Sequence, residues 1–206
     1  MDAVLDVGCG DGAFLKDIGL PPVAALHGIE LHEGKAESAR QLGVEAVIHD
    51  IGQGLPYADD ALDLVFGSFI IEHLLDADIF VTEIFRTLKP GGSAIIGTEN
   101  LASWHNIGAL LLGQQPFTST IGLSSRYRLG NRFQGGRLTE IASDESPHCR
   151  IFTLPGLRDM FTVYGFSIEQ SAGAGYFPLP GKLGNKAASL DPRHAALILI
   201  HAKKPE

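Results

Sequence analysis

A short apolar run followed by three glycines at every second position is the feature that most constrains how this chain can fold. Val4–Val7 alternates β-branched and apolar residues, which predicts a short buried strand. Gly8, Gly10 and Gly12 follow, and an apolar helical pattern begins at Ala13. Strand, glycine turn and helix form the geometry of a nucleotide-type site, because glycine lets a ligand lie against the main chain. The unpaired N–H groups of the helix start can then face a negatively charged group.

The alternation of strand and helix continues along most of the chain. Strands are expected at 4–7, 23–29, 44–48, 61–67, 93–98, 166–169 and 195–202. Helices are expected at 13–18, 32–42, 76–88, 104–112 and 154–164. Strands that alternate with helices at this spacing predict βαβ units, a doubly wound parallel sheet and a ligand site at the carboxyl ends of the strands. The length suits one domain, 1–206.

An acidic residue stands where a nucleotide ribose would be recognised. Glu30 ends the second predicted strand and lies about twenty residues beyond Gly10, the usual place of a ribose-binding carboxylate. A carboxylate suits this role because it accepts hydrogen bonds from both ribose hydroxyls. The spacing of Gly8, Gly10 and Ala13 also fits the dinucleotide fingerprint, so a nicotinamide cofactor stays open at this point. The plain alternative is a tight turn without ligand, with Glu30 in solvent.

Charge and cysteine content exclude several classes of function. A net charge of −8 argues against non-specific binding to nucleic acid or to an anionic membrane. Cys9 and Cys149 are too few for a disulfide scaffold and indicate reduced thiols in a cytoplasmic protein. No signal peptide is evident, and no apolar run approaches the roughly 20 residues of a membrane span. The first strand starts so close to Met1 that a truncated amino terminus is one interpretation.

The segment 101–150 interrupts the strand–helix rhythm. An apolar helical stretch that includes Trp104 is followed by a long run rich in glycine, serine, arginine and glutamine. A loop of this length is functional or mobile, so we expect an insertion that covers the acceptor site as a lid. Arg126, Arg128 and Arg132 would suit a negatively charged acceptor, and an exposed, solvated basic loop is the alternative.

Five stretches in the expected order resemble the motifs of one family, the class I S-adenosylmethionine-dependent methyltransferases. The stretches are Val4–Phe14, Gly28–Glu30, His49–Asp50, Asp63–Leu74 and Leu88–Ser93. The last of them, which contains Leu-Lys-Pro-Gly-Gly, has no place in the dinucleotide fingerprint and so favours this cofactor over a nicotinamide. The tail is similar to the ending of the family, with a helix, Gly165-Phe166 and a final strand. The resemblance implies a Rossmann-like, mostly parallel seven-stranded sheet whose last strand is antiparallel.

The resemblance also implies which residues bind S-adenosylmethionine. Glu30 would hold the ribose diol, Asp50 would accept from the adenine amine, and Ile51 would pack on the ring. Ser68 and Phe69 would lie beside the methyl donor. The complete implied set is Asp6, Gly8, Cys9, Gly10, Gly12, Glu30, Leu31, Asp50, Ile51, Ser68 and Phe69.

For methyl transfer the protein mainly has to position the nucleophile, because the sulfonium methyl group is already activated. A general base is needed only when the nucleophile must lose a proton, and a histidine suits this by its pKa. His73 follows the fourth predicted strand and is the first candidate, with Glu72 as a partner; His148 and His105 are the others. Each of them taken alone can equally be a structural histidine.

The predicted function is methyl transfer to a small-molecule acceptor by a monomer or homodimer, without metal, nucleic acid or membrane. Two alternatives stay open. One is a nicotinamide-dependent oxidoreductase, which the glycine spacing and Glu30 allow. The other is a non-catalytic regulator that kept the cofactor site and lost the chemistry.

Overall fold

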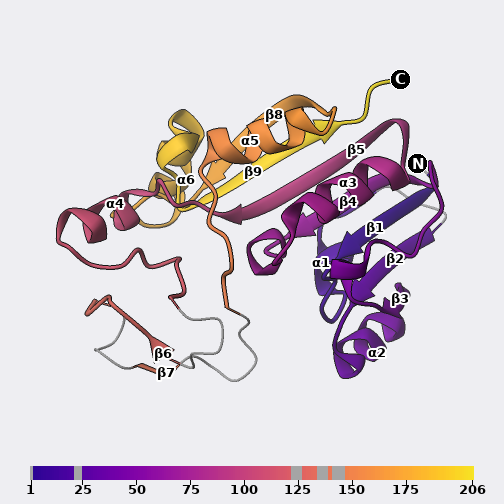
Figure 1. The fold of residues 1–206 in the computed structure, drawn as a ribbon, viewed down its shortest axis with the longest axis horizontal. Coiled ribbons are helices and arrows are strands. Elements are labelled where there is room, and N and C mark those ends of the chain that lie inside the picture. Colours follow the sequence, from indigo (N-terminus) through magenta and orange to yellow (C-terminus); the bar gives the residue numbers. More distant parts are fainter. Residues whose placement is uncertain (1, 21–24, 122–126, 134–138, 141–146) are drawn as a thin grey trace.

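The main body of the molecule is one seven-stranded sheet with helices on both faces (Figure 1). The computed structural model describes residues 2–20, 25–121, 127–133, 139–140 and 147–206. The strands of the sheet, in chain order, are β1 (Ala3–Val7), β2 (Ala25–Glu30), β3 (Glu45–Ile48), β4 (Leu62–Ser68), β5 (Leu88–Glu99), β8 (Ser167–Ala174) and β9 (Leu197–Lys203). Their order across the sheet is β3-β2-β1-β4-β5-β9-β8.

The direction of the strands confirms the predicted fold class. The pairs β1–β2, β1–β4, β2–β3 and β4–β5 are parallel. The last strand in the chain, β9, lies between β5 and β8 and is antiparallel to both. The sheet is therefore Rossmann-like and mostly parallel, and the carboxyl ends of β1 to β5 meet along one edge.

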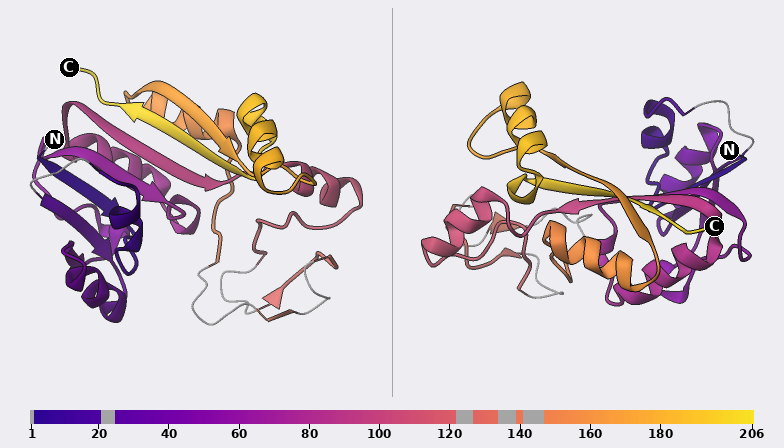
Figure 2. Two further views of the ribbon diagram at one scale, coloured as in Figure 1. Left: turned by 180° about the vertical axis from the view of Figure 1, so that it is seen from behind. Right: turned by 90° about the horizontal axis from the view of Figure 1, so that it is seen from above.

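Helices cover the two faces of this sheet. The six α-helices are α1 (Ala13–Asp17), α2 (Glu33–Gln41), α3 (Ala77–Thr87), α4 (Trp104–Leu111), α5 (Leu154–Val163) and α6 (Gly181–Leu190). Seen from above, α3 and α5 lie on one side of the sheet and α1 and α6 on the other (Figure 2). Among the described residues, none of these helices has the length and apolar character needed to cross a membrane.

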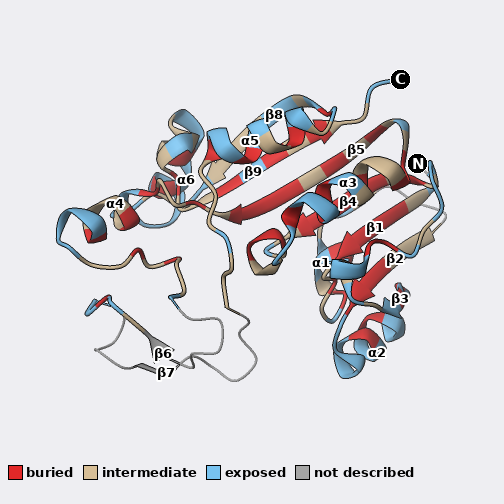
Figure 3. Cartoon of the chain, in the orientation of Figure 1, coloured by how far each residue is buried: buried red, intermediate tan, exposed pale blue. Residues whose placement is uncertain are grey.

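The core has two parts because alternate strand residues face opposite sides of the sheet. Leu5 and Val65 pack with residues of α3 and α5, while their neighbours Val4 and Leu64 pack with residues of α1 and α2. All four side chains are buried. Buried residues accordingly run along both central strands (Figure 3), as expected for a parallel sheet covered on both faces.

The structure departs from the predicted elements in the second half of the chain. Strand β5 begins at Leu88 rather than at residue 93, because the sequence Lys-Pro-Gly-Gly continues the strand through a register shift opposite β4. Helix α6 was not predicted, since its two glycines and the preceding proline hide the helical pattern. Gly184 is required there, because a Cβ would collide with the carbonyl oxygen of Leu179.

The segment 101–150, where the structure describes it, follows directly on β5. It starts with α4 and contains a two-stranded antiparallel pair, β6 (Tyr127–Arg128) and β7 (Thr139–Glu140), which lies below α4 in Figure 1. Asn106 connects this part to the main sheet: its side-chain amide donates to the Asn100 carbonyl at 2.9 Å and to the Thr118 hydroxyl at 2.9 Å. Its own oxygen accepts from the Phe117 N–H at 2.8 Å.

Candidate functional site

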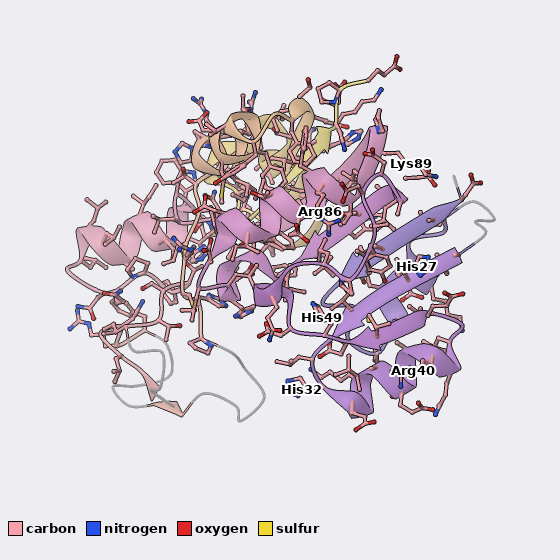
Figure 4. All side chains as sticks on the ribbon, turned by 45° about the vertical axis from the view of Figure 1, so that its right-hand side comes forward. His27, His32, Arg40, His49, Arg86 and Lys89 are labelled. Atoms are coloured by element: carbon pink, nitrogen blue, oxygen red, sulfur yellow. The ribbon has the colours of Figure 1, made fainter. Side chains whose placement is uncertain are left out.

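A cavity of about 690 Å³ opens at the carboxyl ends of β1, β2 and β4. Its size lies in the range of small-molecule and cofactor sites. The lining residues are Gly8, Ile29, Glu30, Leu31, His32, Lys35, His49, Asp50, Ile51, Ile70, His73, Leu74, Leu75, Pro147, His148 and Cys149. Figure 4 labels two of them, His32 and His49, at the edge of the sheet where β2 and β3 end.

The glycine turn forms one wall of this cavity. The N–H groups of Gly8 and Cys9 both donate to the carbonyl of Ile29, at 2.8 and 3.0 Å, which fixes the turn to the end of β2. Gly8 has a φ of 77°, and a Cβ at this position would come within 2.9 Å of the Ile70 side chain. Glycine is therefore required here by its backbone conformation and by the close approach of Ile70.

Glu30 is held rigidly at the end of β2. One carboxylate oxygen accepts from the Gly10 N–H at 3.0 Å, and the other accepts from the N–H groups of Leu31 and His32, both at 2.9 Å. The residue is only 8% exposed, yet it lines the cavity. Three backbone donors stabilise its negative charge and orient the carboxylate, so little further ordering is needed to bind a diol.

Asp50 follows β3, the strand that pairs with β2, and lines the same cavity as Glu30. It caps the short 3-10 turn Ile51–Gln53 by accepting from the Gly52 N–H at 2.9 Å. One carboxylate oxygen therefore faces the backbone, and the side chain as a whole is exposed. Ile51 follows it as a half-buried apolar residue of the lining, which suits the edge of a flat ring.

Four of the predicted cofactor residues support the turn from behind and do not line the cavity. Asp6 is 3% exposed on β1, and burial raises its pKa to about 7. Cys9 packs against Gly28, and burial raises the pKa of its thiol to about 11, so it is a poor nucleophile. Gly10 points its N–H at Glu30, and Gly12 closes the turn by donating to the carbonyl of Cys9 at 2.9 Å.

Ser68 and Phe69 also lie outside the lining, at the end of β4. The N–H of Phe69 donates to the Gly97 carbonyl at 2.9 Å, and its φ of 56° places it in the left-handed region. Such a conformation is strained for an aromatic residue. The turn sends the phenyl ring to the surface, where it is 46% exposed, and brings the next residue, Ile70, to the cavity instead.

The two tentative catalytic histidines come together at the other end of the cavity. The rings of His73 and His148 meet edge to face with centroids 4.9 Å apart. His73 Nδ1 lies 3.1 Å from the carbonyl of Pro147, and His148 Nδ1 lies 2.7 Å from the carbonyl of Thr118. A carbonyl only accepts, so each Nδ1 carries a hydrogen and each Nε2 keeps its lone pair in the neutral ring.

Two carboxylates stand next to these histidines. Glu72 is 2% exposed and accepts from the Thr98 hydroxyl at 2.9 Å; burial raises the pKa of its carboxyl, against the opposing effect of both histidines. An oxygen of Glu99 lies 3.1 Å from His148 Nδ1 and has no hydrogen bond, because that N–H is directed to Thr118. The Glu99 carboxylate raises the pKa of His148. Glu99 had no role in the sequence prediction, since only the fold brings it to residue 148.

Other sequence candidates lie away from the cavity lining. The Trp104 indole N–H donates to the Tyr176 hydroxyl at 2.7 Å and its ring stacks on His194, so it links α4 to the region of α6. His105 does not line the cavity, and burial lowers its pKa. The Arg132 guanidinium lies 5.1 Å from the centre of the Phe133 ring. Arg126 and the side chain of Arg128 lie outside the described residues.

Sequence reasoning missed part of the lining. His32 and Lys35 flank the start of α2, and Leu74, Leu75 and Cys149 surround the histidine pair. His32 and Lys35 follow Glu30 closely and could have been predicted from the motif, because the first turn of the helix after a ribose-binding carboxylate borders the same site. The other three depend on the contact of 72–75 with 147–150, in which the N–H groups of Cys149 and Arg150 donate to the Glu72 carbonyl at 2.7 and 3.1 Å.

Strand order and cavity position together define a Rossmann-like α/β domain with its cavity at the carboxyl ends of the strands. A solved S-adenosylmethionine-dependent methyltransferase from Mesorhizobium loti shares the fold, with a TM-score of 0.64 and 18% identity over 98% of this chain and 90% of that one. At this identity the likeness concerns the fold alone.

The sequence comparisons find similarity to methyltransferases, most of it in the first half of the chain. Residues 5–96 match the family described as Methyltransferase domain. A probable S-adenosylmethionine-dependent methyltransferase of Mycolicibacterium smegmatis is 26% identical over 95% of this chain and 61% of its own length. Ajmaline N-methyltransferase of Rauvolfia serpentina is 35% identical over 45% of this chain and 34% of its own length. The chain thus spans less than two thirds of either relative.

These matches confirm the resemblance to the class I S-adenosylmethionine-dependent methyltransferases. The cofactor that this family implies is S-adenosylmethionine, and the site fits it in two respects. The glycine turn leaves space at the cavity wall that a Cβ would partly fill. The Glu30 carboxylate faces the same cavity. The nicotinamide alternative has no comparable support, since both relatives are methyltransferases by name.

Proposed function

We propose that this chain transfers a methyl group from S-adenosylmethionine to a small-molecule acceptor. The observation that carries the proposal is the position of Glu30, which lies beside an open glycine turn at the carboxyl edge of a Rossmann-like sheet. A preorganised carboxylate at this position suits a ribose, because it can accept from both hydroxyl groups. Methyl transfer needs this orientation of the donor more than any other contribution of the protein.

The cofactor end of the cavity lies between β1, β2 and β3. Gly8 and the N–H groups of the turn would meet the amino-acid part of the cofactor, and Glu30 with Leu31 the ribose. Asp50 and Ile51 would hold the adenine at the end of β3. Four residues would act indirectly, by fixing the turn: Asp6, Cys9, Gly10 and Gly12. Ser68 and Phe69 would act by directing Ile70 toward the donor.

The acceptor would bind at the histidine end. When bound, S-adenosylmethionine supplies an electrophilic methyl group that needs no further activation by the protein. His73 and His148 hold their Nδ1 hydrogens on backbone carbonyls, so their Nε2 lone pairs can meet an acceptor O–H or N–H. The leucines Leu74 and Leu75 give this end an apolar wall, which favours the non-polar part of a small molecule and excludes water.

The segment 101–150 would serve as the acceptor wall, as its sequence suggests. The support is that its described residues supply three groups at this end: the Thr118 carbonyl, the imidazole of His148 and the Cys149 side chain. We further propose a monomer or homodimer in the cytoplasm, in line with two cysteines that are both free.

A titration with S-adenosylhomocysteine, the demethylated product, tests the proposal. We expect saturable binding to the full chain by calorimetry, and a fall in affinity of about 10- to 100-fold for Glu30→Ala, because charged hydrogen bonds of this kind contribute about 1.5–3 kcal/mol each. Glu33→Ala is the matched control, since Glu33 lies in the first turn of α2 on the exposed surface and outside the cavity lining.

Two results would count against the proposal. One is the absence of binding to the unchanged protein. The other is an affinity of Glu30→Ala equal to that of Glu33→Ala. Because Glu30 also accepts three backbone hydrogen bonds, thermal unfolding of both variants must show that they are folded at the temperature of the titration.

A further inference from the structure

Three potential metal ligands converge at the histidine end of the cavity. Glu72, His73 and His148 each offer one ligand atom, and these three atoms lie within 4.8 Å of one another. Glu72 and His73 belong to the 3-10 turn Ile71–His73 after β4, whereas His148 lies shortly before α5. No metal is expected from the sequence, because His148 lies far along the chain from Glu72 and His73.

Both imidazole rings are fixed in the orientation that metal binding needs. Metal-binding histidines commonly donate their second ring N–H to a carbonyl or carboxylate, which sets the tautomer and the direction of the free lone pair. Here the Pro147 carbonyl takes the Nδ1 hydrogen of His73, and the Thr118 carbonyl takes that of His148. The Glu99 carboxylate stands 3.1 Å behind the His148 Nδ1 as well. In the neutral rings the lone pairs that could bind a metal ion are then those of the two Nε2 atoms.

The carboxylates of Glu72 and Glu99 favour the binding of a cation at this end of the cavity. Glu72 is almost completely buried and accepts from the Thr98 hydroxyl at 2.9 Å. The buried Oε2 of Glu99 has no hydrogen bond from the described part of the chain. Among the described residues, no lysine or arginine forms an ion pair with either carboxylate. Glu99 has His148 as an ion-pair partner at 3.1 Å, so the costly carboxylate is that of the buried Glu72, beside which a bound divalent ion would supply positive charge.

We propose that Glu72, His73 and His148 bind a divalent transition-metal ion such as Zn²⁺ or Mn²⁺. Two imidazoles and one carboxylate suit such an ion, whereas Mg²⁺ and Ca²⁺ prefer oxygen ligands alone. Three protein ligands leave coordination positions open to the cavity, as in catalytic rather than structural sites. The three ligand atoms lie within 4.8 Å of one another and would come somewhat closer when the ion binds.

The ion would define the class of acceptor, and this part rests on the proposed function. An acceptor hydroxyl bound to the ion would lose its proton to water at neutral pH, because a divalent cation stabilises the oxyanion. The oxygen keeps the electron pair with which it attacks the methyl group. The two histidines would then act through the ion, and the preferred acceptor would be a small molecule with an oxygen nucleophile.

Titration of the chelator-treated full chain with Co²⁺ and Zn²⁺ tests the site without any acceptor. We expect one equivalent per chain by calorimetry and a visible Co²⁺ spectrum. His148→Ala and Glu72→Gln should each lower the affinity at least tenfold, because each removes one of three ligands. His32→Ala is the matched control: this histidine lines the cofactor end of the same cavity, and its loss should change the affinity less than twofold.

Weak binding that is equal in the unchanged protein, in His148→Ala and in His32→Ala would overturn the metal site. Binding of S-adenosylhomocysteine to each sample shows whether the variant is folded, since Glu72 and His148 lie outside the proposed cofactor contacts. It also separates the two proposals. Loss of the cofactor product from the unchanged protein contradicts the proposed function, whereas loss of the metal alone contradicts only this inference.

Discussion

The two ends of the cavity are built in different ways. At the cofactor end, the carboxylates are held by backbone N–H groups of the turns that follow the strands, as Glu30 is by those of Gly10, Leu31 and His32. At the histidine end, groups from distant segments hold one another, as the carbonyls of Pro147 and Thr118 hold the two rings. The first end is part of the sheet, and the second depends on how the segment 101–150 is attached to it.

This difference has a functional consequence. A cofactor shared by many enzymes can be held by a turn that the fold itself dictates. The acceptor differs between enzymes, and a loop segment beside a rigid sheet can vary without loss of the core. Changes at the cofactor end should therefore alter the stability of the whole domain, whereas changes at the histidine end should alter that end alone.

The largest expected effect is on the stability of the cofactor end, at Asp6. Burial raises its pKa from 3.8 to about 7, so the folded state holds its proton more tightly than the unfolded state. This residue therefore lowers the free energy of unfolding progressively as the pH rises from about 4 to about 7. Asp6→Asn should be more stable than the unchanged protein, by about 3 kcal/mol more at pH 8 than at pH 5.

Urea unfolding at both pH values measures this difference. Asp11→Asn serves as the control, because Asp11 lies on the exposed surface of the same turn. If Asp6→Asn changed the free energy of unfolding equally at pH 5 and pH 8, Asp6 would be ionised in the folded protein. That result would contradict its role as a buried support of the turn.

An effect of equal or smaller size is expected for the glycines of the turn. Gly12 has a φ of 83°, and a Cβ would come within 3.0 Å of the Ala39 backbone in α2, whereas a Cβ on Gly10 would enter open space at a φ of 56°. Gly12→Ala should cost about 3 kcal/mol and Gly10→Ala about 1 kcal/mol, because the second change adds left-handed strain alone. Equal losses in thermal or urea unfolding would contradict the close packing of the turn on α2.

The smallest effect is expected at the histidine end. Thr118→Val keeps the shape of the side chain but leaves one Asn106 amide hydrogen without its acceptor, at a cost of about 1 kcal/mol. Because the Thr118 carbonyl holds the His148 ring, the substitution should also weaken Zn²⁺ binding by about threefold, which corresponds to about 0.65 kcal/mol of binding free energy. The affinity for S-adenosylhomocysteine should stay the same within error. A parallel loss of both affinities would mean that the two ends are not independent.

The same contrast explains what could be predicted from the sequence. The glycine turn, Glu30 and Asp50 were predictable because each lies at a strand end that its own neighbours specify. The pairing of His73 with His148, and the position of Glu99 behind it, were not, because these depend on the path of the chain between α4 and α5. Ser68 and Phe69 were expected beside the methyl donor, but the left-handed turn at Phe69 puts Ile70 on the cavity lining instead.

Strand prediction shows the same division. The strands β1 to β4 are short, apolar and bounded by clear turns, and all of them were expected. The extension of β8 to Ala174 and the helix α6 were missed, because glycines that elsewhere end an element are here required by close packing. Gly173, for example, lies where a Cβ would collide with the Ala195 side chain.

A crystal structure of the full chain with S-adenosylhomocysteine tests the central claim most directly. The account predicts the ribose hydroxyls within hydrogen-bonding distance of the Glu30 carboxylate, the adenine beside Asp50 and Ile51, and the sulfur directed toward His73 and His148. A product bound elsewhere on the molecule, or bound in this cavity with its sulfur directed away from the two histidines, would contradict it.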